Sequence, residues 1–91
     1  MTSRARHFRL TALHAQHALA LQTPSTARGR RAKTLAIGAF RDYARVGREW
    51  VLTGQARLHG NRAVATMHAR LASRYAKKGN SLLVGAGRLL Q

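Results

Sequence analysis

Apolar residues recur every three or four positions along most of this 91-residue chain, which is the spacing that places them on one face of an α-helix. Runs of this kind cover residues 2–22, 32–58 and 62–78. Gly79 has the properties of a helix C-terminal cap, so we expect a short fourth helix from Asn80 or Ser81 to Leu90. The pattern therefore predicts an all-α chain.

Each predicted helix carries one apolar stripe that is expected to face the core. The stripes of the three runs are Leu10, Leu13, His17 and Leu21, then Ala36, Phe40, Tyr43, Gly47 and Trp50, and finally Val64, Met67, Leu71 and Tyr75. The largest of these side chains, Trp50, is expected to be the packing anchor between the second and third helices. If it is buried there, its truncation to Ala would cost about 3–5 kcal/mol.

Two breaks separate the runs. Residues 22–31 contain the only proline, Pro24, and a proline biases the residue before it toward extended backbone. His59-Gly60-Asn61 has the composition of a tight turn, in which Asn61 is suited to begin the next helix as its N-cap. We therefore predict a basic N-terminal arm or helix with its linker over residues 1–31, followed by a small three-helix globule over residues 32–91.

Composition and charge indicate that the chain needs a partner and is not a self-contained domain. Seventeen Lys and Arg residues face two acidic residues, so the formal net charge is +15. A compact monomer of this charge repels itself, and alanine supplies many of its apolar residues. Most of the basic residues are Arg, whose planar guanidinium binds phosphate in a bidentate way. Structured RNA is the favoured partner over DNA, an acidic protein or a membrane surface.

Several classes of function have no support in the sequence. There is no cysteine, so there is no disulfide or thiolate metal site, and no apolar run approaches the roughly 20 residues of a membrane span. His14 and His17 alone do not make a metal site. The two carboxylates, Asp42 and Glu49, are both within helical reach of Arg45 and so are expected to form ion pairs with it. We expect no enzyme activity, no catalytic residue, no metal, no cofactor and no small-molecule substrate.

Clusters of Arg are the candidate RNA contacts. The densest is Arg28-Gly29-Arg30-Arg31-Ala32-Lys33, and a second lies at the start of the first predicted helix. Positive charge at a helix N-terminus opposes the helix macrodipole, so this second cluster favours an external phosphate. The predicted RNA-binding residues are Arg4, Arg6, Arg9, Arg28, Arg30, Arg31, Lys33, Arg45, Arg48, Arg57 and Arg62.

Short motifs add a family resemblance. Phe40-Arg41-Asp42, Trp50-Val51 and Arg57-Leu58-His59-Gly60, together with Arg4-Ala5-Arg6-His7 near the start, are similar to motifs of bacterial-type large-subunit ribosomal protein twenty. The resemblance implies a long basic helix that threads through rRNA and ends in a small helical globule. It also implies a structural constituent of the large subunit in translation, with rRNA and neighbouring ribosomal proteins as partners.

Other interpretations of the family, location and function remain open. The run Thr53-Gly54 to Gly60 resembles small-subunit ribosomal protein fourteen, and Phe40-Arg41-Asp42-Tyr43 resembles the Leu-Tyr-Arg family of mitochondrial accessory subunits. The first 33 residues are basic and lack acids, like a mitochondrial transit peptide. We therefore expect a ribosomal protein of the mitochondrial matrix, with another organelle or the bacterial cytoplasm as alternatives. The alternative functions are an accessory subunit of a mitochondrial inner-membrane complex, binding protein or anionic lipid, and a DNA-compacting protein.

Overall fold

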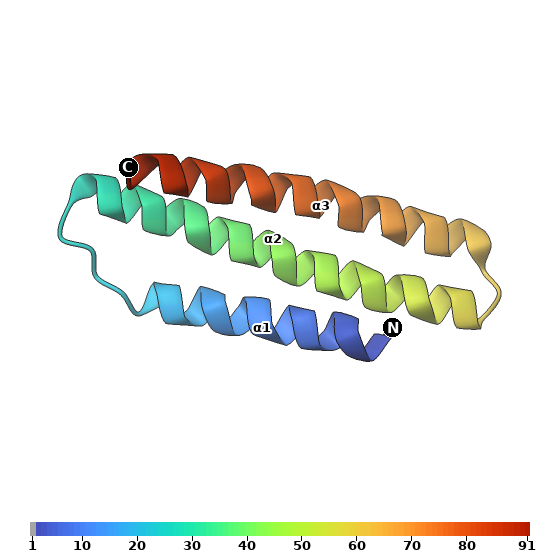
Figure 1. Cartoon of the computed structure of the whole chain (residues 1–91). Helices are drawn as coiled ribbons and strands as arrows, with labels where there is room; N and C mark the ends of the chain where they lie inside the picture. The colour runs from blue at the N-terminus through green and yellow to red at the C-terminus, as the bar shows by residue number, and fades with distance from the viewer. Residues whose placement is uncertain (1) are drawn as a thin grey trace.

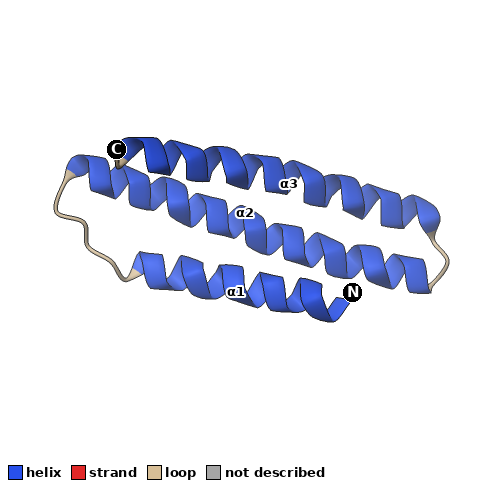
Figure 2. Cartoon of the chain, viewed as in Figure 1, coloured by secondary structure: helices blue, strands red, loops and turns tan. Residues whose placement is uncertain are grey.

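Three long helices make up the part of the chain that the computed structural model describes, residues 2–91 (Figure 1). They are α1 (Thr2–Ala20), α2 (Ala27–Leu58) and α3 (Arg62–Leu89). Within the described residues there are no strands, as the colouring by secondary structure shows (Figure 2). The predicted all-α fold class is confirmed.

Local capping chemistry explains where two of the helices begin. The hydroxyl of Thr26 accepts a hydrogen bond from the backbone N–H of Gly29 at the start of α2. The side-chain oxygen of Asn61 accepts one from the N–H of Val64 at the start of α3, at 3.1 Å. Gly60 precedes Asn61 with a φ of +71°, a left-handed conformation that glycine adopts without strain. The predicted tight turn and the predicted N-cap at Asn61 are both confirmed.

The prediction that Gly79 ends the third helix is wrong, because α3 continues without a break to Leu89. Gly79 is buried in the middle of α3, where a Cβ atom would lie 2.9 Å from Cε1 of Tyr43 and 3.2 Å from the carbonyl oxygen of Ala39. The glycine is therefore explained by close helix packing rather than by capping. The separate fourth helix does not form.

The three helices lie side by side in one flat layer, with α2 in the middle (Figure 1). α2 packs against both of its neighbours, whereas α1 and α3 make no contact with each other within the described residues. The Cα atoms extend over 51 × 20 × 13 Å, so the molecule is long and thin. Such a layer has two broad faces and leaves both of them open.

Small side chains fill the contacts between the helices. In α3 the buried residues recur every seventh position, at Ala65, Ala72, Gly79 and Ala86. The predicted stripe of larger residues flanks this seam, and its Met67 is 48% exposed. The predicted core stripe of the third helix is therefore wrong in detail, because a seam of Ala and Gly lets two helix backbones approach more closely than Leu or Met would.

The same close packing joins α1 to α2. Among residues 3–20 of α1, Ala5 and Ala12 are the buried ones, and they take the place predicted for Leu10 and Leu13, which are exposed. Opposite them lies Gly47, where a Cβ atom would be only 2.9 Å from the backbone oxygen of Ala5. There is no room for a larger side chain at this crossing, and the predicted stripe of the first helix is displaced to the surface.

The prediction for Trp50 is also wrong. Its ring is not enclosed between α2 and α3 but is 38% exposed on one broad face of the layer. Thr53 and Asp42 are the largest side chains that are fully buried. The α2–α3 contact is thus held mainly by small residues, and the aromatic ring that packs across it is that of Tyr43 against Gly79, not that of Trp50.

Candidate nucleic-acid interface

Both acidic side chains of the chain are buried in the contact between α2 and α3. Asp42 is 2% exposed and accepts a hydrogen bond of 3.3 Å from Nη1 of Arg45, so the predicted pair of these two residues forms. Glu49 is 7% exposed, and its Oε2 lies 2.5 Å from Nδ1 of His68. The predicted pairing of Glu49 with Arg45 is wrong, because the carboxylate points to α3 instead.

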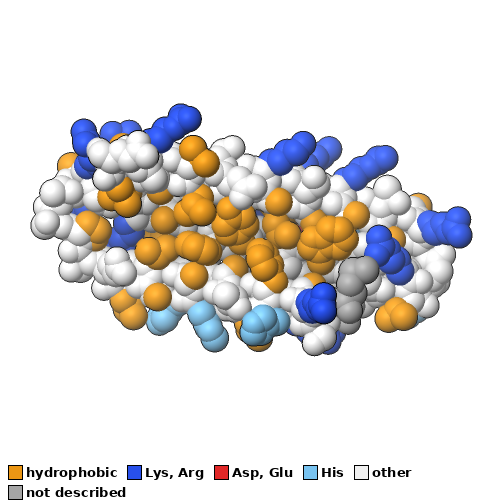
Figure 3. Space-filling model, in the orientation of Figure 1, with side chains coloured by type: hydrophobic (Ala, Val, Ile, Leu, Met, Phe, Trp, Pro, Cys, Tyr) orange, Lys and Arg blue, Asp and Glu red, His pale blue; other side chains and the backbone are white. Residues whose placement is uncertain are grey.

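The outer surface of residues 2–91 therefore presents no exposed acidic side chain. Figure 3 shows Lys, Arg and His side chains on the face in view and no acidic ones. A phosphate that approaches this surface meets no like charge, and the long-range field around the protein is positive on every side.

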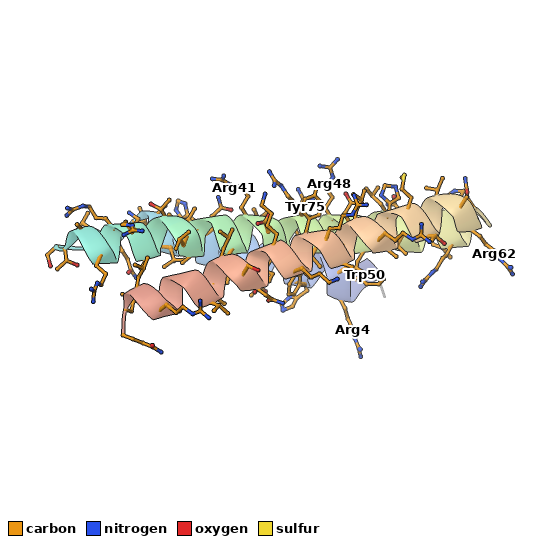
Figure 4. All side chains as sticks on the ribbon, turned by 90° about the horizontal axis from the view of Figure 1, so that it is seen from above. Arg4, Arg41, Arg48, Trp50, Arg62 and Tyr75 are labelled. Carbon is orange, nitrogen blue, oxygen red and sulfur yellow. The ribbon has the colours of Figure 1, made fainter. Side chains whose placement is uncertain are left out.

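Five arginines gather on one broad face of the layer. Three come from α2, where their spacing of four and three residues puts them on one side of the helix, and two come from α1 across a shallow groove. We call this surface the Arg face, and its members are Arg6, Arg9, Arg41, Arg45 and Arg48. Figure 4 shows Arg41 and Arg48 on one side of the layer and Trp50 on the other.

The groove between the two helices has an apolar floor. It is lined by Leu10 and Leu13 of α1 and by Val51 and Leu52 of α2, between the arginines. The aliphatic stems of Arg side chains can lie along such a floor while their guanidinium groups stay in water. The arrangement presents the charges at the rim of the groove, where they can reach a polyanion.

Arg45 is the best-oriented member of the Arg face. Besides its bond to Asp42, its guanidinium carbon lies 5.5 Å from the centre of the Tyr75 ring on α3. A cation held over an aromatic ring and by a carboxylate loses less conformational freedom when it binds a ligand. Asp42 therefore acts as a positioning group for the one exposed Arg that it contacts.

Four of the predicted contact residues are brought together on the Arg face: Arg6, Arg9, Arg45 and Arg48. Arg41 was not predicted, although its spacing from Arg45 and Arg48 is the helical signal that could have identified it. Arg30 lies 11 residues before Arg41, close to three helical turns, so it continues the same row toward the start of α2.

The remaining predicted residues lie elsewhere. Arg28 and Arg31 are exposed in the first turns of α2, inside the helix and not in a linker. Arg4 projects from the side of the layer opposite to Arg41 (Figure 4). Arg57 and Arg62 line a separate shallow depression next to the α2–α3 turn. The structure thus divides the predicted set into one main cluster and outlying cations.

Lys33 has an internal role. Its ammonium group donates hydrogen bonds of 3.0 Å to the carbonyl oxygen of Ala20 and 2.5 Å to that of Gln22. These carbonyls belong to the end of α1 and the loop after it, so Lys33 fastens the end of α1 to the start of α2. Its side chain is half-buried and is not free to bind phosphate in this arrangement.

Replacing Lys33 by Gln is expected to lower the free energy of unfolding by about 0.5–1.5 kcal/mol, because two carbonyl groups lose their donor. Urea unfolding followed by circular dichroism measures the change. Arg30→Gln is the matched control, because it removes the same charge from the same end of α2 at an exposed position. An equal loss in both variants would contradict the assigned role.

The described residues contain no group of three or more His, Cys, Asp or Glu side chains placed to hold a metal ion. Nor is any helix within residues 2–91 both long and apolar enough to cross a membrane. No protein-family model, no curated protein and no solved structure matches the chain. The chemistry of the exposed surface is therefore what indicates a function.

Proposed function

We propose that this protein is a structural RNA-binding protein, a constituent of a ribosome, whose Arg face binds the phosphates of rRNA. The observation that carries the proposal is the separation of charge in the fold. Both carboxylates are buried between α2 and α3, while five arginines share one open face. A surface of this kind binds a polyanion by displacing its counterions.

The geometry of the Arg face supports recognition of the RNA backbone. At 1.5 Å per residue, the row from Arg30 to Arg48 extends over about 27 Å along α2. The ring of Tyr75 lies beside this row and is covered by Arg45. Base stacking is therefore a minor contribution on this face, and we expect shape and phosphate contacts to dominate over sequence.

The salt dependence of RNA binding follows from the number of phosphate contacts. Six arginines, the five of the Arg face and Arg30, each neutralise one phosphate in the proposed complex. Borrowing the coefficient for duplex DNA, the slope of log affinity against log salt is expected to be about −5. Titrating a labelled RNA hairpin at several salt concentrations measures this slope.

Crosslinking in cells, followed by sequencing of the attached RNA, tests the proposal directly. We expect rRNA fragments to dominate, the protein to sediment with ribosomal particles, and nuclease to release it from them. The matrix of mitochondria is the proposed location, on the strength of the basic and acid-free N-terminal third. Sedimentation with an inner-membrane complex that survives nuclease would contradict the proposal and support the accessory-subunit alternative.

A further inference from the structure

The face of the layer opposite to the Arg face is aromatic and apolar. Phe8 of α1 and Phe40 of α2 both contact Tyr43 edge to face, with ring centres 6.3 and 5.9 Å apart. The hydroxyl of Tyr43 donates to the side-chain oxygen of Asn80 on α3. Trp50 lies two helical turns after Tyr43 on the same side of α2. We call these four residues, Phe8, Phe40, Tyr43 and Trp50, the aromatic face.

Much of this surface is open to solvent. Phe8 is 44% exposed and Trp50 is 38% exposed. Figure 3 shows a band of hydrophobic side chains along the middle of the face in view, with Lys and Arg side chains toward its margins. Large rings normally supply the core of a small domain, but here Phe8 and Trp50 are exposed and Phe40 and Tyr43 only partly buried, beside a core made mainly of alanine.

We propose that the aromatic face is the interface with a second copy of this chain. Stable domains consist of at least two packed layers, and a single chain supplies only one. The longer Cα extents, 51 and 20 Å, bound a face of about 1,000 Å², compared with about 800 Å² per partner in a standard specific interface. A second copy offers a face of matching length and matching apolar character.

Each chain carries a net charge of +15, but its main cationic cluster lies on the face directed away from the proposed interface. The middle of the aromatic face carries no acidic or basic group that would require a complement. When two copies meet face to face, the interface is the same patch on both, and the two Arg faces are directed outward on opposite sides. The two Arg faces are then kept apart, outlying cations such as Arg4 project on the interface side, and the six-helix particle has two separate surfaces for nucleic acid.

Sedimentation equilibrium of the full chain, after nuclease treatment, tests this inference without any RNA present. We expect about 20 kDa, twice the 10.0 kDa of one chain. Trp50 is the only tryptophan, so its fluorescence reports on the interface alone. Its emission should shift to shorter wavelength as protein concentration rises, and the unmodified chain provides this readout whether or not a variant folds.

Trp50→Glu places a charge in the proposed interface and should give a monomer. Met67→Glu is the control, because Met67 is also a large hydrophobic residue and is 48% exposed, but it lies on the α3 stripe that it shares with Leu71 and Tyr75. Tyr75 projects on the side of Arg41 and Arg48 (Figure 4). This control should remain a dimer.

A species of 10.0 kDa at all concentrations up to about 100 µM would overturn the inference, because interfaces of this size have micromolar or tighter affinity. So would a fluorescence shift that appears only with anionic phospholipid vesicles, which would assign the aromatic face to a lipid surface. Neither result depends on whether the Arg face binds RNA.

Discussion

Replacing Arg9, Arg41 and Arg48 together by Gln should weaken RNA binding by about 100-fold or more at 0.1 M salt, because three charge-assisted phosphate contacts are lost. These three residues line adjoining parts of the groove on the Arg face. The slope of log affinity against log salt should become less steep by about 3 units, close to one for each phosphate. Fluorescence anisotropy with a labelled hairpin measures both quantities.

The choice of residues keeps the fold intact. Arg45 is left in place, because its removal would strip the buried carboxylate of Asp42 of its partner and confuse binding with stability. The matched control replaces Arg70, Arg74 and Arg88 by Gln. These residues are exposed on α3, and their replacement removes the same total charge. If both triple variants lose the same affinity, binding depends on total charge and the Arg face has no special role.

The helices and the turn between α2 and α3 could be predicted because local chemistry determines them. Asn61 caps α3 with its own side chain, and Gly60 supplies the left-handed residue before it. Each of these depends on neighbours within a few positions. The predicted start of α2 near Ala32 is wrong, because Thr26 caps a helix that begins at Ala27.

The packing could not be predicted in the same way, because an apolar stripe was assumed to bury its largest members. In α3 the larger residues beside the seam are partly exposed, and the Ala and Gly residues meet α2. A seven-residue repeat of small side chains was present in the sequence and is the signal that identifies this seam. Alanine contributes little to a hydrophobic pattern, so a search for large apolar residues does not identify this repeat.

The sequence predicts those features of the candidate site that depend on charge. It does not predict those that depend on which residues contact each other in the fold. The basic residues of α1 and α2 could be named from composition, yet the shared face follows from how α1 packs on α2. The role of Lys33 required knowing that α1 ends beside it. No local pattern reveals a hydrogen bond between residues 13 positions apart across a loop.

Two Gly→Ala substitutions are expected to change stability in opposite directions. Alanine favours a helix over glycine by about 0.8–1 kcal/mol. At Gly87 nothing lies within 4 Å of the new Cβ atom, so Gly87→Ala should raise the free energy of unfolding by about that amount. At Gly47 the new atom would lie 2.7 Å from Cβ and 3.0 Å from Cα of Arg9.

Because the atoms around Gly47 belong mainly to the α1 backbone, they cannot move aside as a flexible side-chain end would. Gly47→Ala should therefore lower the free energy of unfolding by about 1–3 kcal/mol, an overpacking cost that exceeds the gain in helix propensity. Urea unfolding at one fixed protein concentration compares the two variants. Hydrogen exchange should show faster exchange in α1 than in α3 for the Gly47 variant only.

Loss of the α1–α2 packing in the Gly47 variant should also affect the Arg face. Arg6 and Arg9 stand opposite Arg48 only while α1 is packed on α2, so Gly47→Ala should also weaken RNA binding without removing a single charge. Gly87→Ala should leave binding unchanged. If Gly47→Ala stabilised the protein as Gly87→Ala does, α1 would not be packed at this crossing, and the groove between α1 and α2 would not exist in solution.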